Sequence, residues 1–112
     1  MAAAVVTYRP GLGMTAFSEG RYVTDGSPVA TNINCGFVPS RVEIVNASDL
    51  DASAVWTSDM ANGTAIDDTG AAIASNGITP VAQTDGVNHG FLVGTSTVIN
   101  EASKTFTWRA YR

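Results

Sequence analysis

The sequence predicts an all-β fold, a small antiparallel β-sandwich or barrel with an extended N-terminal arm. Short stretches of alternating apolar and polar residues recur along the chain, and turn-forming dipeptides separate them at intervals of roughly 8–12 residues. No stretch has the 3.6-residue period of a convincing amphipathic helix. With 112 residues, the chain fits one domain. We therefore expect a single β domain over residues 20–112, preceded by residues 1–19.

The C-terminal stretch is the most strongly patterned, and it is expected to organise the sheet. Phe106, Trp108 and Ala110 fall on one side of an extended strand, whereas Arg109 and Tyr111 fall on the other with the threonines. A period of two is typical of a half-buried strand. Aromatic and β-branched residues also suit its pleated surface.

The natural partners of this strand are residues 41–46 and 54–58, the second of which carries Trp56. The first alternates, so that Val42 and Ile44 face away from Glu43. We expect the three stretches to form the centre of one antiparallel sheet.

The N-terminal 19 residues differ from the rest and leave two interpretations open. Residues 1–8 could form a short strand, but Pro10 and the glycines on either side of Leu12 interrupt any regular element. The segment is either a first strand followed by a loop, or an extended arm that becomes ordered only against another subunit. In the second case its anchors are Tyr8, Leu12, Met14 and Phe17.

Turn signals define the elements that follow. Asp25-Gly26 is typical of a tight turn, so residues 21–24 and 29–35 are expected to pair as a hairpin. Residues 65–75 are rich in small side chains and read as weak strands at an edge or in a loop.

The last third of the chain supplies further strands. Pro80 demotes residues 78–83 to an edge strand, because proline cannot donate to a ladder. Residues 90–94 form another strand, and 95–103 turn toward the terminal one with Val98 and Ile99 facing inward.

Charge and composition exclude several function classes. All six basic residues lie in the two end regions, and the span from residue 42 to 103 holds eight acids and no Lys or Arg. A nucleic-acid binder needs a clustered basic face, which this layout does not offer. The acids suit solvated loop tips, or alternatively a basic neighbour in an assembly. No apolar run approaches the roughly 20 residues of a membrane helix, and no signal peptide is recognisable.

No combination of residues predicts a catalytic, cofactor or metal site. His89 is the only histidine, so no two-histidine metal site can form within one chain. The acid pairs Asp49/Asp51 and Asp67/Asp68 fit turns better than a calcium site or a glycosidase pair. Cys35 lies in an apolar stretch and suits a small buried side chain in a reduced protein. Trp56, Trp108, Phe106 and Tyr111 suit a core better than a sugar-stacking platform. We expect no enzyme, and a small hydrolase built on His89 is the weakest alternative.

A set of motifs in one order resembles a group of viral proteins. They are GFVPSRVEIVN (36–46), a Trp-bearing strand ending in Met (56–60), SNGIT (75–79), GFLVG (90–94) and KTFTWRA (104–110). Together they cover residues 20–112 and resemble small structural proteins of tailed-bacteriophage virions, in particular capsid decoration (cement) proteins.

The resemblance implies a compact β domain that binds the outside of the head, often as a trimer, and clamps neighbouring major capsid proteins. It implies no catalytic residues, no cofactor, no nucleic acid and no membrane partner. The protein would be made in the host cytoplasm and reside on the virion surface. We expect partner contacts from Tyr8, Leu12, Met14 and Phe17, with Arg9 and Arg21 as ion-pair partners. The alternative is a tail or fibre-associated β module, in one version with a carbohydrate-binding face.

Overall fold

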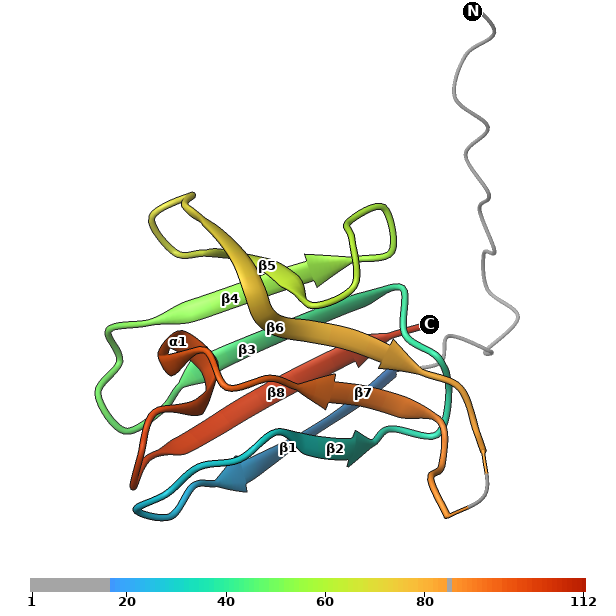
Figure 1. Ribbon diagram of the computed structural model, residues 1–112, viewed down its shortest axis with the longest axis horizontal. Coiled ribbons are helices and arrows are strands. Elements are labelled where there is room, and N and C mark those ends of the chain that lie inside the picture. The colour runs from blue at the N-terminus through green and yellow to red at the C-terminus, as the bar shows by residue number, and fades with distance from the viewer. Residues whose placement is uncertain (1–16, 85) are drawn as a thin grey trace, which may run out of the picture.

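The computed structural model describes residues 17–84 and 86–112, which form one curled, eight-stranded antiparallel sheet (Figure 1). Its elements are β1 (Phe17–Val23), β2 (Thr31–Asn34), β3 (Arg41–Asn46), β4 (Ser53–Thr57), β5 (Thr64–Asp67), β6 (Ala72–Val81), β7 (Gly90–Val93), α1 (Thr97–Asn100) and β8 (Thr105–Tyr111). The strand order is β1-β8-β3-β4-β5-β6-β7-β2. The predicted all-β class is confirmed, as a curled sheet resembling half of a barrel.

The predicted centre of the sheet is correct. β3 pairs with β8 on one side and with β4 on the other, so that Ile44 lies opposite both Trp108 and Ala54. The alternation of β8 holds as well, because Phe106, Trp108 and Ala110 are buried while the residues between them face outward. The period of two therefore identified both the strands and their buried sides.

The core fills the concave side of the curl. Its largest fully buried side chains include Trp56, Phe91 and Phe106. The Trp56 indole Nε1 donates a hydrogen bond of 3.1 Å to the carbonyl of Ala61. Trp108 meets Phe91 edge to face with ring centroids 5.4 Å apart, a favoured aromatic geometry. The interpretation of Trp56, Trp108 and Phe106 as core residues is confirmed, whereas the same interpretation of Tyr111 is wrong, because Tyr111 lies on the outward side of β8.

The predicted hairpin between residues 21–24 and 29–35 is wrong. The chain does reverse after Asp25, but β1 pairs with β8 and β2 pairs with β7, at opposite ends of the strand order. The carbonyl of Asp25 accepts from Ser103 N, which ties the turn to the segment before β8. Contacts with remote strands, rather than the local turn, decide the pairing.

The expectation that residues 65–75 form weak strands at an edge or in a loop is wrong for β5 and correct in part for the rest, because residues 68–71 form the turn between β5 and β6 and the start of β6 pairs with β5 alone. β5 lies inside the sheet between β4 and β6, with Ala65 buried, and Ile73 on β6 belongs to the core. Pro80 likewise lies within β6, an internal strand, opposite Phe91 of β7. Gly63, the residue before β5, donates its N–H to the Ile78 carbonyl, so β5 begins too late in the chain to lie opposite Pro80. The proline therefore costs no ladder hydrogen bond.

One helical turn, α1, interrupts the segment that was expected to contain turns only. The Ser96 side chain accepts from Val98 N at its start, and Ile99 is fully buried as predicted. Asn100 is also buried, and its Nδ2 donates 2.9 Å hydrogen bonds to the carbonyls of Val29 and Gly94. α1 therefore anchors the loop between β1 and β2. Across the described ranges, no helix is long and apolar enough to cross a membrane.

Candidate partner-binding face

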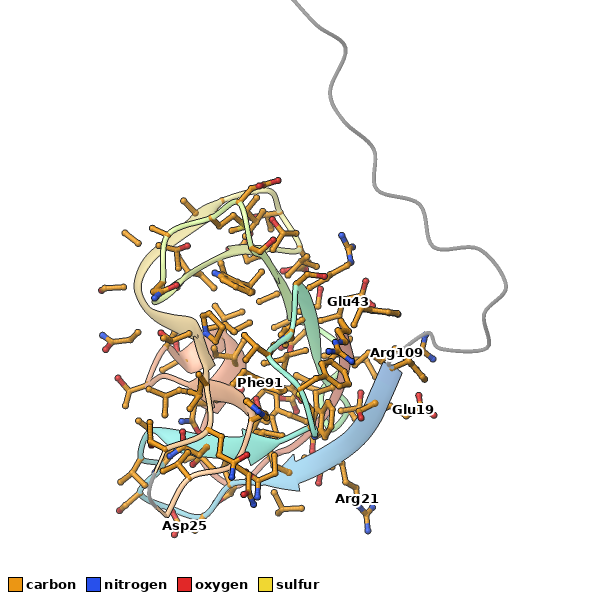
Figure 2. All side chains as sticks on the ribbon, turned by 90° about the vertical axis from the view of Figure 1, so that its right-hand side faces the viewer. Glu19, Arg21, Asp25, Glu43, Phe91 and Arg109 are labelled. Atoms are coloured by element: carbon orange, nitrogen blue, oxygen red, sulfur yellow. The ribbon has the colours of Figure 1, made fainter. Side chains whose placement is uncertain are left out.

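The outward surface of β1, β8 and β3 carries the most chemically varied cluster of exposed side chains. The strand register places these side chains in rows, because antiparallel partners lie directly opposite one another. The rows are Phe17–Tyr111–Arg41, Glu19–Arg109–Glu43 and Arg21–Thr107–Val45. We call these nine residues the outer face. Figure 2 shows Glu19, Arg21, Glu43 and Arg109 together on this side of the sheet, away from the buried Phe91.

The charges of the outer face alternate in sign. Arg41 Nε lies 2.9 Å from Glu43 Oε2, and Arg109 Nε lies 3.5 Å from Glu19 Oε2. Arg21 forms no ion pair with any residue of the described ranges. The side chains of the Arg109–Glu19 pair are more than half exposed, so the pair contributes little to stability. These side chains remain accessible to a partner.

A groove of about 600 Å³ runs through the middle of the outer face. Its walls are Glu19 and Arg21 on β1 and Glu43 and Val45 on β3, while the short side chain of Thr107 leaves the centre open. Phe17 and Tyr111 pack at the end of the face, with ring centroids 5.2 Å apart. Phe17 remains 44% exposed, although it is a large apolar residue. The outer face therefore combines a groove with charged walls and, beside it, an accessible aromatic pair.

Two of the six predicted partner-binding residues belong to this face. Phe17 and Arg21 are four positions apart on β1, and their side chains point to the same side. Tyr8, Arg9, Leu12 and Met14 lie outside the described residues. β1 begins at Phe17, so three residues of the predicted arm, 17–19, belong to the sheet.

Sequence reasoning missed the other members of the face. Arg109 and Tyr111 were correctly placed on the outward side of the last strand, but nothing local indicated that Glu19 and Glu43 lie on either side of Arg109. That neighbourhood depends on β8 inserting between β1 and β3, two strands that are distant from it in the chain.

Residues that were considered for a catalytic or metal site form hydrogen bonds that hold loops in place. The Nδ1 atom of His89 accepts a 3.1 Å hydrogen bond from Gln83 N, and its carbonyl accepts from Cys35 N. Asp67 Oδ1 accepts from Thr69 Oγ1 and from the N–H groups of Thr69 and Ala71. The hydroxyl of Thr69 first, and then the Ala71 N–H, lower the pKa of the Asp67 carboxyl.

A second acidic cluster surrounds the buried side chain of Asn46. Its Oδ1 accepts 3.0 Å hydrogen bonds from Ser48 N and Asp49 N, while its Nδ2 donates toward the carboxylates of Asp49 and Glu101. Lys104 Nζ lies 3.0 Å from Asp49 Oδ1, and this hydrogen bond raises the lysine pKa. These contacts close the loop after β3. Within the described ranges, no three His, Cys, Asp or Glu side chains are placed to hold a metal ion.

Comparison with known proteins finds no match to this chain among family models, curated proteins or solved structures.

Proposed function

We propose that this chain is a structural protein of a tailed-bacteriophage virion, most specifically a head decoration protein. It binds the outer capsid surface and stabilises contacts between major capsid proteins. The observation that supports the proposal is the outer face, where Arg21 and Arg109 line an open groove and Phe17 and Tyr111 pack at the end of the face. The other predicted contact residues precede Phe17 directly in the sequence. We infer the capsid as the partner because the motifs, in their order, resemble those of capsid decoration proteins.

Binding through such a face requires little desolvation of isolated charge. Arg41 and Arg109 already have carboxylate neighbours, and a partner that inserts polar groups between them can exchange one ion pair for another. A protein that binds only the assembled shell stabilises it by mass action, and repeated copies add avidity. This mechanism requires no chemical step.

The alternative is a tail or fibre-associated module, which would use the same outer face. Of the four aromatic residues considered for its carbohydrate-binding version, Trp56 and Phe106 are buried and Trp108 is only 7% exposed, which leaves Tyr111 beside Phe17. Sugar stacking needs an open aromatic ring face. A carbohydrate-binding version would therefore have to use the Phe17–Tyr111 end of the outer face.

Cosedimentation with phage heads that lack the protein tests the proposal. The full chain should bind saturably, and residues 17–112 should bind more weakly, because this truncation leaves β1 intact and removes only the predicted contacts before it. Arg21→Ala and Arg109→Ala should weaken binding. Lys104→Ala is the matched control, because it removes one cation at the start of β8, away from the groove. Lack of saturable binding to heads, with binding to isolated tails, would overturn the decoration proposal.

A further inference from the structure

Among the strands of the described ranges, β1 is the end strand of the sheet and pairs on one side only. Thr24 N donates to the Lys104 carbonyl in the β1–β8 register, so the backbone groups of residues 18, 20 and 22 also point toward β8. Those of Phe17, Glu19, Arg21 and Val23 point the other way. Within the described ranges, β1 has no ladder partner on that side. Such an edge is a template for an added strand.

β2, at the other end of the strand order, also has an edge without a ladder partner within the described ranges. The bond from Cys35 N to the His89 carbonyl shows that β2 directs its odd-numbered backbone groups to β7, so those of Asn32 and Asn34 face away from the sheet. β1 and β2 make little contact, apart from a 2.8 Å hydrogen bond from Ser18 Oγ to the Cys35 carbonyl. We call the boundary between these two edges the seam; a side chain bridges it at one end, and no ladder of the described residues joins its two strands.

The core is incompletely covered along β1 and β2. Gly20 has no side chain, and the Trp108 indole lies against it. Tyr22 and Ile33, which pack against the core from the two edge strands, remain partly exposed. A strand added to β1 would bring alternate side chains over these residues, in addition to filling the ladder positions.

We propose that residues 2–8 of a second copy of this chain pair with the free edge of β1, so that copies assemble by exchanging their N-terminal segments. These residues, AAAVVTY, are uncharged and strand-compatible. The 16 residues before β1 can span roughly 50 Å when extended, comparable with the 47 Å length of the molecule. They can therefore reach a neighbour.

Pairing within one chain is less favourable. To lie against its own β1, the segment 2–8 would need a hairpin connection made of residues 9–16. Hairpin loops usually have about 2–5 residues. A Pro10-Gly11 turn of type II would also splay the strands on either side of it. Exchange between copies avoids both problems.

Exchange between copies uses residues 2–8, including Tyr8, for contacts between copies of this chain. The outer face, with Arg9, Leu12 and Met14, is left for the proposed contact with the head.

Hydrogen exchange and sedimentation of the free protein test this inference without any head. The amides of Glu19 and Arg21 should exchange at least about tenfold more slowly in the full chain than in residues 9–112. The amides of Gly20 and Tyr22, which are bonded to β8, should be equally protected in both. The full chain should sediment above its 11.6 kDa monomer mass, and the truncated chain should sediment as a monomer.

A substitution at the edge separates backbone pairing from side-chain contact. Glu19→Pro removes an N–H that points into the seam and should abolish association, whereas Glu19→Ala should preserve it. Proline is tolerated at such a position, and near-ultraviolet circular dichroism verifies folding. A monomeric full chain with slow Glu19 and Arg21 amides would show pairing within one chain, and fast amides in both forms would exclude strand addition. Either result overturns the inference and leaves the proposal of head binding intact.

Discussion

The indole of Trp108 lies so close beneath Gly20 that a β-carbon on this glycine would be 2.9 Å from Cζ2 of the ring. The two residues are direct partners in the β1–β8 register. Phe91 packs edge to face against the same ring, which restricts its movement away from the glycine. Glycine at position 20 is therefore a packing requirement of the edge strand.

Gly20→Ala should destabilise the fold by about 1–3 kcal/mol, the usual cost of overpacking a core. The free energy of unfolding in urea, followed by tryptophan fluorescence, measures the effect. Gly26→Ala is the control, because nothing lies within 4 Å of the position of its added β-carbon. Equal stability of Gly20→Ala and the unmodified protein would contradict the packing account.

Asn46→Ala should cost about 1–3 kcal/mol, because it leaves buried groups without partners. Asn46 is fully buried, and its Oδ1 accepts from two backbone N–H groups of the loop that follows β3. Thermal or urea unfolding measures this loss. Asn62→Ala, at an exposed position in the next loop, should change stability by less than about 0.5 kcal/mol. Similar losses for both variants would show that the hydrogen bonds of Asn46 have no special importance.

Acid should reveal the role of Asp67. Its folded-state pKa is lowered below the ordinary 3.8, chiefly by the Thr69 hydroxyl and then by the Ala71 N–H. A lowered pKa contributes stability that is complete above the unfolded-state value and is lost as the pH falls through the folded-state value.

The unmodified protein should therefore lose stability relative to Asp67→Asn as the pH falls below 3.8. Asparagine keeps the accepting oxygen but does not titrate. The range from about pH 6 to pH 2 includes the pKa of an aspartate, so melting temperatures of the two proteins over this range measure the difference. A constant difference in melting temperature would show that the ionised Asp67 carboxylate is not the source of the stability. Asp68→Asn is the neighbouring control.

Cys35 should react slowly with a thiol reagent in the folded protein. Its side chain is buried, and burial raises the pKa of the thiol, which lowers the fraction of reactive thiolate. Labelling with a disulfide reagent should be at least about tenfold faster after unfolding in guanidinium. Equal rates in the two states would show that the thiol is open to solvent, contrary to its place between β2 and Phe37.

The parts of the fold that the sequence predicted well are those in which local pattern and burial agree. β3 and β8 alternate strictly, so both the strands and their buried residues, such as Ile44 and Trp108, could be read directly. β5 and the start of β6 were misjudged because Ala65 and Ala72 have little intrinsic preference for strands. Pairing of β5 with strands on both sides, one of which is the start of β6, compensates for that weakness.

The outer face was predictable only in part, for a related reason. Phe17 and Arg21 could be proposed from their position near the N-terminus, and the alternation of the last strand turned Arg109 outward. The approach of Arg109 to Glu19, however, depends on the β1–β8 register. A single sequence contains no signal that fixes such a long-range pairing, and the attractive local Asp25-Gly26 turn suggested a different partner for β1.

The position of β8 between β1 and β3 has a consequence for the synthesis of the protein. All other strands emerge from the ribosome before β8, yet its two neighbours include the first strand of the sheet. The run from β3 to β7 joins sequential neighbours and can form early, whereas β1 has no partner in the sheet until residues 105–111 emerge. Pairings so distant in sequence make folding slow. During synthesis, β1 therefore remains unpaired in the sheet until β8, the most aromatic strand, has been made.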